Sequence, residues 1–164
     1  MRKLRTIEMN RLTLEEFKEA EKLPLIVVLD DVRSLYNVGS VFRSCDAFRV
    51  EAVYLCGITE DSVDWEYFKT TEEAVEKLKQ KGYFVYSIEQ VEGSTKLQNL
   101  PEAHPSLSKG YAVIFGNEVK GVKQNIVDMS DGSLEIPQFG TKHSLNVSVT
   151  AGIVVWEFAK LLKL

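Results

Sequence analysis

Three short stretches of the chain combine glycines with polar side chains that could bind a ligand or take part in catalysis. They lie at residues 37–43, 115–121 and 136–146. Amide, carboxylate, hydroxyl and guanidinium groups can position a polar substrate and stabilise charge that develops in a reaction. Glycines let the backbone approach a ligand closely. The three stretches therefore predict a binding site assembled from separate parts of the sequence.

Each stretch also has an ordinary structural explanation. Asn37 can cap a helix, and Arg43 can form a surface ion pair with Asp46. The glycines of residues 115–121 suit a plain strand-to-helix turn. Ser144 can be the N-cap of the strongly apolar helix that follows it. For any one stretch these explanations are sufficient, and it is the occurrence of all three that favours a site.

None of the stretches is a familiar phosphate-binding motif, and no metal site is expected. Residues 116–122 lack the Gly-Lys-Ser/Thr ending of a phosphate loop, and the chain has no Gly-x-Gly-x-x-Gly fingerprint. His104 and His143 are too few for a metal site. Cys45 and Cys56 lie among apolar residues, which favours buried thiols over a disulfide or a metal pair.

Apolar runs alternate with helical patterns, and these elements must position the three stretches. Short runs rich in β-branched and aromatic residues indicate buried strands, expected at residues 25–29, 52–56, 83–88, 111–115 and 134–136. Capping residues and helical spacing indicate helices at residues 13–22, 37–48, 71–81 and 122–127, and a final helix from Ser144. Residues 59–70 and 93–108 are interpreted as loops. The alternation predicts an α/β fold, a mostly parallel sheet with helices on both faces.

The predicted sheet explains how the three stretches could meet. They follow the strands expected at residues 25–29, 111–115 and 134–136. In an open parallel sheet, ligands bind beyond the carboxyl ends of the strands. We therefore expect the polar groups of all three stretches at one edge of the sheet.

Composition favours one main domain with an uneven charge distribution. The chain has 164 residues, of which 45% are hydrophobic, and a net charge of −4. No apolar run is long enough to span a membrane and residues 1–10 do not resemble a signal peptide, so we expect a cytoplasmic protein. Residues 1–11 are basic and could be a nucleic-acid-binding arm or a solubilising tail. We divide the chain into a basic N-terminal arm and helix, residues 1–24, and a domain of residues 25–164.

Taken together, the three stretches closely resemble the SpoU (TrmH-type) branch of the SPOUT RNA methyltransferases. The resemblance is carried by Asn-x-Gly-x-x-x-Arg at residues 37–43, Phe-Gly-Asn-Glu-x-x-Gly at 115–121, and Ile-Pro followed by Ser-Leu-Asn-Val-Ser within 136–148. The three motifs occur in the order of the family, and the similarity covers nearly all of residues 25–160. Three motifs in order are far more specific than any one of them.

The resemblance implies both a fold and a reaction. The fold is the SPOUT α/β knot, in which the C-terminal segment forms a deep trefoil knot, and the assembly is a homodimer with the final helix in its interface. The reaction is methyl transfer from S-adenosyl-L-methionine (AdoMet) to a ribose 2′-hydroxyl of RNA. We favour tRNA over ribosomal RNA because the chain has a short basic arm and no added RNA-binding domain. A non-catalytic RNA- or AdoMet-binding module on the same fold is the alternative.

The resemblance also assigns residues to roles. It implies that the catalytic residues are Arg43, Asn37, Glu118, Ser144 and Asn146. It implies that AdoMet is held largely by backbone groups at Ile88, Gly116, Ile136 and Leu145, with Ser144 nearby. An arginine side chain stays protonated in proteins. We therefore expect Arg43 to grip phosphate and stabilise the developing alkoxide, and the proton to leave to phosphate, water or another group.

The chain departs from the family pattern after Ile58. There the family usually carries a longer, proline-containing loop with a Lys-Thr-Ala-Leu-Gly-like run, whereas this sequence passes directly from Thr59 to Glu60 and Asp61. The family uses this region near the substrate and the dimer partner. The substrate contacts of residues 58–61 are therefore left open.

Overall fold

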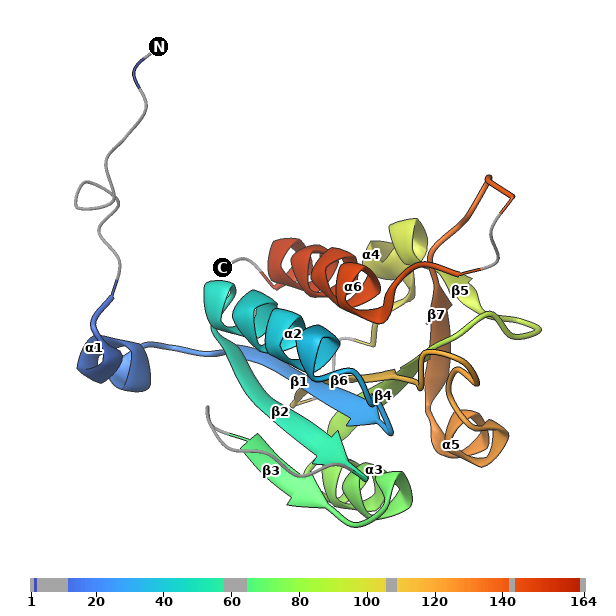
Figure 1. Cartoon of the computed structure of the whole chain (residues 1–164), viewed down its shortest axis with the longest axis horizontal. Coiled ribbons are helices and arrows are strands. Elements are labelled where there is room, and N and C mark those ends of the chain that lie inside the picture. The colour runs from blue at the N-terminus through green and yellow to red at the C-terminus, as the bar shows by residue number, and fades with distance from the viewer. Residues whose placement is uncertain (1, 3–11, 58–64, 106–108, 142–143, 163–164) are drawn as a thin grey trace.

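The computed structural model of the chain describes residues 2, 12–57, 65–105, 109–141 and 144–162 (Figure 1). The strands are β1 (Leu23–Asp30), β2 (Val50–Cys56), β3 (Trp65–Phe68), β4 (Tyr83–Ile88), β5 (Thr95–Lys96), β6 (Gly110–Phe115) and β7 (Gly132–Glu135). The helices are α1 (Leu14–Glu19), α2 (Leu35–Ala47), α3 (Thr71–Gln80), α4 (Leu100–Ala103), α5 (Gln124–Met129) and α6 (Val147–Leu161), with a 3₁₀ turn η2 (Leu97–Asn99).

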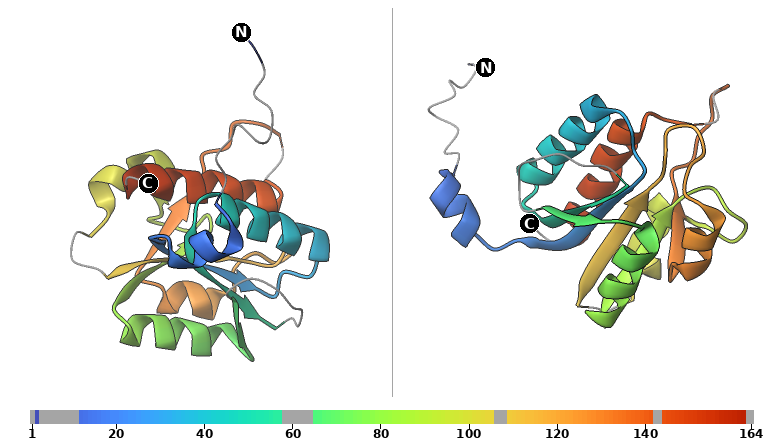
Figure 2. Two further views of the ribbon diagram at one scale, coloured as in Figure 1. Left: turned by 90° about the vertical axis from the view of Figure 1, so that its left-hand side faces the viewer. Right: turned by 60° about the horizontal axis from the view of Figure 1, so that its bottom comes forward.

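The strands of the described chain form one seven-stranded sheet in the order β3-β2-β1-β6-β4-β7-β5. Every neighbouring pair is parallel. Figure 2 shows α2 and α6 on one face of the sheet and α3 and α5 on the other. The predicted α/β architecture with helices on both faces is confirmed. The trefoil knot and the division at residue 24 stay predictions.

The interior strand β1 is buried on both faces, which explains its nearly unbroken apolar sequence. Leu25, Val27 and Leu29 belong to the core under α2 and α6. Ile26 and Val28 point the other way, into the core under α3 and α5. A strand that alternates between two cores needs apolar residues at every position, so a continuous run rather than an alternating pattern predicted it.

Two segments interpreted as loops contain secondary structure, so those predictions were wrong. Residues 65–68 form the edge strand β3, where Phe68 is buried and its ring centre lies 4.8 Å from that of Tyr54. Residues 95–103 form β5, η2 and α4, anchored by the buried Leu97 and Leu100. Each of these elements is so short that it contributes at most one buried apolar residue to the core. Isolated apolar residues of this kind show no hydrophobic periodicity in the sequence.

The N-terminal helix matches its sequence signal at the start but not at the end. Thr13 and Glu16 form the predicted capping box, each side chain bonding to the backbone N–H of the other. The helix ends at Glu19, not at Lys22, and β1 begins at Leu23. No residue of α1 is buried, so nothing beyond its cap extends it.

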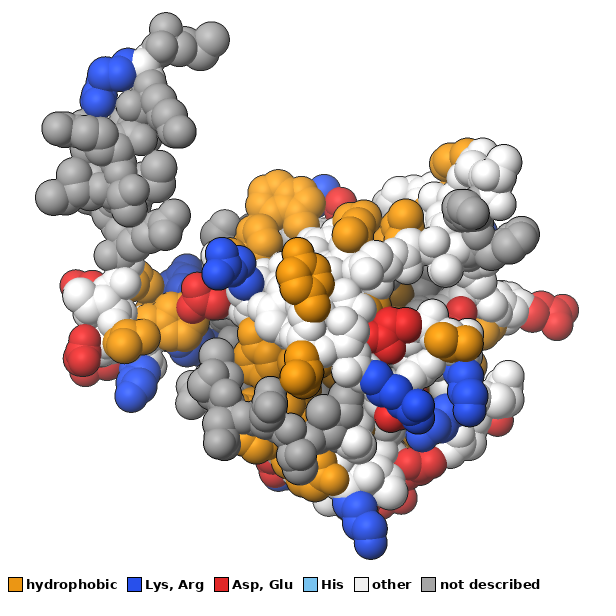
Figure 3. Space-filling view, in the orientation of Figure 1, with side chains coloured by type: hydrophobic (Ala, Val, Ile, Leu, Met, Phe, Trp, Pro, Cys, Tyr) orange, Lys and Arg blue, Asp and Glu red, His pale blue; other side chains and the backbone are white. Residues whose placement is uncertain are grey.

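Helix α6 is apolar around more of its circumference than the sheet requires. Its inner side buries residues against the sheet, including Ala151, Val155 and Phe158. Its outer side exposes Val149, Ile153 and Trp156. Figure 3 shows hydrophobic side chains gathered on the face that α2 and α6 form. No helix in the described part of the chain is long and apolar enough to cross a bilayer.

Candidate active site

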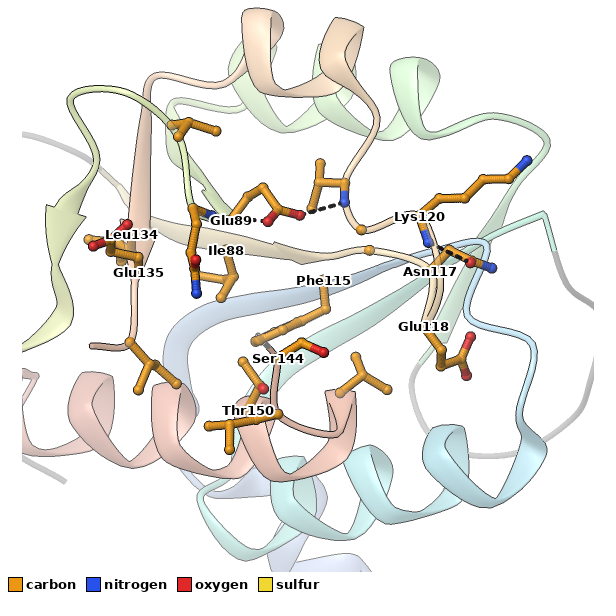
Figure 4. A pocket seen from close by; sticks show the side chains of 18 of the residues that line it. Ile88, Glu89, Phe115, Asn117, Glu118, Lys120, Leu134, Glu135, Ser144 and Thr150 are labelled. Carbon is orange, nitrogen blue, oxygen red and sulfur yellow. Dashed lines mark hydrogen bonds between the residues drawn. The ribbon is translucent and has the colours of Figure 1, made fainter. Parts of the chain in front are cut away.

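A cavity of about 640 Å³ opens at the carboxyl ends of β6, β4 and β7 and reaches the start of α6 (Figure 4). The structure brings all five predicted cofactor-binding residues into its lining: Ile88, Gly116, Ile136, Ser144 and Leu145. Glu118 and Asn146, two of the predicted catalytic residues, line it as well. The second and third stretches therefore meet where the sheet topology places them.

Three side chains from the three stretches form a hydrogen-bonded chain at the edge of this cavity. The Asn37 amide donates from Nδ2 to Glu118 Oε1 over 3.1 Å. The Asn146 amide donates from Nδ2 to Asn37 Oδ1, also over 3.1 Å. Asn37, which does not line the cavity, is 5% exposed and lies between the other two. The contacts join positions 81 and 109 residues apart in the sequence.

The Glu118 carboxylate also ties the second stretch to the loop after β1. It accepts hydrogen bonds from the backbone N–H groups of Arg33, at 3.3 Å, and Ser34, at 3.1 Å. Partial burial opposes ionisation, but hydrogen bonds from Glu118's own backbone N–H, from Asn37, and from the backbones of Ser34 and Arg33 outweigh it. They lower the pKa of Glu118 from its ordinary value of 4.5. This carboxylate is an acceptor that fixes the start of α2.

Because its pKa is lower in the folded than in the unfolded protein, Glu118 should stabilise the fold most above pH 4.5. That contribution is lost as pH falls through the folded pKa. We expect Glu118→Gln to lower the melting temperature at pH 7. The difference in melting temperature between the variant and the unmodified protein should become smaller below pH 4.5. Thermal unfolding of both proteins from pH 7 to pH 3 measures this. A gap that is independent of pH would contradict the hydrogen-bonded carboxylate.

The helix caps are not the residues that the ordinary structural explanations offered. Ser34, not Asn37, caps α2, and its hydroxyl accepts the Asn37 backbone N–H. Asn146, not Ser144, caps α6, and its Oδ1 accepts the backbone N–H of Ser148 at 2.9 Å and the hydroxyl of Ser148 at 2.6 Å. The observed cap lies three residues before Asn37 at α2 and two residues after Ser144 at α6. Because Asn37 does not cap α2, its side chain can hydrogen-bond to Glu118 instead.

The loop from residue 116 to residue 122 is folded tightly back on itself. Asn117 Oδ1 accepts the backbone N–H groups of Val119 and Lys120, at 2.9 and 3.2 Å. Asn117 Nδ2 donates to the carbonyl of Asp31 at 2.9 Å, which ties this loop to the end of β1. A Cβ on Gly116 would lie 2.0 Å from the backbone carbon of Gly121. The loop closes only because residue 116 has no side chain.

This close approach predicts opposite effects of one substitution at two glycines. Gly116→Ala must push the loop apart, so we expect a large loss of stability and of ligand binding. Gly39→Ala lies within α2 and meets nothing within 4 Å, so helix propensity should stabilise the fold by about 1 kcal/mol. Chemical denaturation of both variants checks the pair. Equal effects at the two positions would contradict the packing at Gly116.

The structure does not bring Arg43 into the cavity. Arg43 is exposed on α2 and is absent from the cavity lining. The surface ion pair with Asp46 that offered a plain explanation is absent from the described residues. Ser144 lines the cavity and is exposed. Three of the five predicted catalytic residues therefore line the cavity: Glu118, Ser144 and Asn146. Asn37 is buried behind the lining, and Arg43 lies away from it on the surface of α2.

Sequence reasoning assigned no role to several groups that the structure places at the site. Glu89 lines the cavity directly after β4, and Ser148 fixes the amide of Asn146. Asn117 closes the loop after β6. The signal available for Glu89 was its place immediately beyond a predicted strand, since it belongs to none of the three motifs. Residues 58–61, where the sequence departs from the family pattern, fall outside the described residues.

Comparison with known proteins agrees with the motif pattern. Residues 59–156 match the sequence model of the SpoU rRNA Methylase family. The chain is 30% identical over 158 residues to a tRNA (guanosine(18)-2′-O)-methyltransferase of Aquifex aeolicus, covering 88% of this chain and 72% of that protein. The chain belongs to the SpoU family. The family predicted from the three stretches is thereby confirmed.

Further similar proteins cover most of the chain. The chain is 29% identical over 163 residues to a tRNA (guanosine(18)-2′-O)-methyltransferase of Thermus thermophilus, covering 92% of this chain and 81% of that protein. The crystal structure of the A. aeolicus TrmH/SpoU tRNA modifying enzyme superposes with a TM-score of 0.74 at 25% identity. It covers 85% of this chain and 76% of that one. The SpoU relationship therefore extends well beyond the three motifs.

Proposed function

We propose that the protein transfers a methyl group from AdoMet to a ribose 2′-hydroxyl of tRNA. The observation that carries the proposal is the hydrogen-bonded chain of Glu118, Asn37 and Asn146, which unites the three SpoU motifs beside one cavity. The choice of tRNA is supported by the names of the Aquifex and Thermus relatives. Ribosomal RNA is the alternative substrate, since the matching family model is described as the SpoU rRNA Methylase family.

The cavity suits AdoMet in size and in the character of its walls. Its volume of about 640 Å³ lies within the range of small-molecule sites, roughly 300–1,000 Å³. Ile88, Ile136 and Leu145 supply apolar surface for a purine, and Glu118 and Asn146 supply polar groups at one side. When bound, AdoMet supplies an electrophilic methyl group on a sulfonium ion. The residues proposed to hold it are Ile88, Gly116, Ile136, Ser144 and Leu145.

The chain's own residues then orient the reacting hydroxyl and balance its charge. Asn37 is a positioning residue, because it holds the Glu118 carboxylate and the Asn146 amide in fixed orientations. Ser144, in the cavity wall, can hydrogen-bond to the ligand or substrate. The positively charged guanidinium of Arg43 grips phosphate and stabilises the alkoxide that forms at the ribose. The proton of the 2′-hydroxyl leaves to phosphate or water.

The position of Arg43 supports a homodimer in which α2 and α6 lie in the interface. Arg43 is exposed and outside the lining of its own chain's cavity. The neighbouring outer side of α6 exposes Val149, Ile153 and Trp156, an apolar face that a second copy would cover. A dimer through this face brings two copies of α2 together, so that Arg43 of one copy can act on RNA held at the cavity of the other.

The dimer predicts the behaviour of a charged substitution at Trp156, whose side chain is half-exposed on α6. We expect Trp156→Glu to be a monomer of about 18.6 kDa and the unmodified chain to have twice that mass. Light scattering after size exclusion measures both. Leu14→Glu, at an exposed leucine of α1, is the matched control and should stay dimeric. A monomeric unmodified chain, or a dimeric Trp156→Glu, would contradict this interface.

The reaction is tested by following radiolabelled methyl from AdoMet into total tRNA and, separately, into ribosomal RNA. Label in tRNA, resistant to alkali because a 2′-O-methylated ribose blocks strand cleavage, would support the proposal. Label in ribosomal RNA alone would keep the reaction and replace the substrate. Label in neither pool by a protein that binds AdoMet would contradict catalysis and favour a non-catalytic binding module on this fold.

A further inference from the structure

Glu89 places a carboxylate in the wall of the cavity immediately beyond β4. Its Oε2 accepts the backbone N–H of Val122 at 3.0 Å, and its Oε1 accepts the backbone N–H of Gln90 at 3.0 Å. A Cβ on Gly121, whose φ is +66°, would lie 2.2 Å from Glu89 Oε2. The carboxylate and the glycine loop therefore fit against each other, and the carboxylate has one fixed position.

The hydrogen bonds leave Glu89 with unused acceptor capacity facing the ligand space. A carboxylate oxygen can accept two hydrogen bonds, and each Glu89 oxygen accepts one. In the described part of the chain no lysine, arginine or histidine pairs with it. Glu135 also lines the cavity but is occupied, since it pairs with Lys96 and accepts the Ser94 hydroxyl at 2.7 Å. Glu89 is the better-placed acceptor for a ligand.

The strand order places Glu89 between the two ends of the cavity. Glu118 follows β6, Glu89 follows β4 and Ile136 follows β7, and β4 lies between the other two strands. Figure 4 shows Glu89 between Glu118 on one side of the cavity and Leu134 and Glu135 on the other. A methyl group that reacts beside the Glu118 chain would leave the purine beside Leu134 and Ile136, at the other end of the cavity. The ribose, which joins them, would then lie at Glu89.

We propose that Glu89 binds the 2′- and 3′-hydroxyls of the cofactor's ribose, an inference that rests on the proposed use of AdoMet. Two neighbouring hydroxyls offer two donors, and the two carboxylate oxygens offer two acceptors. Acidic side chains at the carboxyl ends of parallel strands bind ribose hydroxyls in dinucleotide-binding folds for the same reason. By holding the ribose and the Val122 backbone at once, Glu89 couples cofactor binding to the position of the 116–122 loop.

Calorimetric binding of S-adenosylhomocysteine and of its 2′,3′-dideoxy analogue to the intact chain tests the assignment. We expect the unmodified protein to prefer the natural ligand by about tenfold or more, as for hydrogen bonds to a charged group. Glu89→Gln should lose most of that preference by weakening only the natural ligand. Glu135→Gln, at the occupied carboxylate, should keep the preference. Glu89→Asp, which keeps the charge on a shorter side chain, should retain part of it.

Each outcome distinguishes this inference from the function on which it rests. Equal weakening of both ligands by Glu89→Gln would mean that Glu89 only supports the Gly121–Val122 backbone, which overturns the ribose contact. Equal affinity of the unmodified protein for both ligands overturns it as well and leaves AdoMet as the cofactor. Failure of the unmodified protein to bind S-adenosylhomocysteine would overturn the proposed cofactor and the ribose contact together.

Discussion

Replacing Arg43 with alanine is expected to lower the rate of methyl transfer to RNA by about 10²–10³-fold, as for loss of one donor to a developing oxyanion. The affinity for S-adenosylhomocysteine should not change, because Arg43 does not line the cavity of its own chain and, in the proposed dimer, contacts the RNA rather than the cofactor at the other copy's cavity. The melting temperature should also be little affected, because Arg43 is exposed. Single-turnover methylation and calorimetry on the same preparation measure the rate and the affinity separately.

Arg43→Lys separates charge from geometry. Lysine keeps the positive charge but cannot reproduce the two-pronged grip of a guanidinium on phosphate. We expect the lysine variant to remain strongly impaired across pH 7–9, with an activity between those of the alanine variant and the unmodified protein. Near-normal activity would contradict a geometric role for the guanidinium. Normal activity of Arg43→Ala would remove the residue from the mechanism.

The sequence was most informative where a single physical requirement acts on consecutive residues. Strand β4 at Tyr83–Ile88 has the predicted bounds, because aromatic and β-branched residues, which suit a strand, fill nearly all of it. The meeting of residues 115–121 with residues 136–146 also followed, since both come after parallel strands and ligands collect at that edge. These are consequences of the α/β architecture, and short-range patterns suffice to detect them.

The sequence was least informative where a side chain can choose between several partners. Asn37 can cap a helix by its type, yet Ser34 caps α2 and Asn37 turns inward to Glu118. The same competition at α6 leaves Asn146, not Ser144, as the cap. The outcome depends on a carboxylate and an amide 81 and 109 residues away, which no local pattern contains. The family resemblance grouped these residues as catalytic but did not reveal the hydrogen bonds that connect them.

That connection makes Asn37 the most sensitive positioning residue of the site. Asn37→Ala would remove the donor to Glu118 Oε1 and the acceptor for Asn146 Nδ2 in one step. Since the side chain is buried, unpaired polar groups should lower the free energy of unfolding by about 1–3 kcal/mol. Release of Glu118 and Asn146 should lower the methylation rate by about 10²-fold, a typical effect of misplacing groups by about 1 Å.

Two further variants show whether the connection, rather than general stability, is responsible. Asn125→Ala removes another asparagine that donates to a glutamate, Glu72, but on the exposed side of α5, so its methylation rate should be unchanged. Asn37→Asp keeps an acceptor for Asn146 and sets a second carboxylate against Glu118. Because two close carboxylates favour sharing a proton, its activity should recover partly as pH falls from 8 to 6. An Asn37→Ala variant with a normal methylation rate but lowered stability would mean that the hydrogen bonds among Glu118, Asn37 and Asn146 stabilise the fold and do not position groups for catalysis.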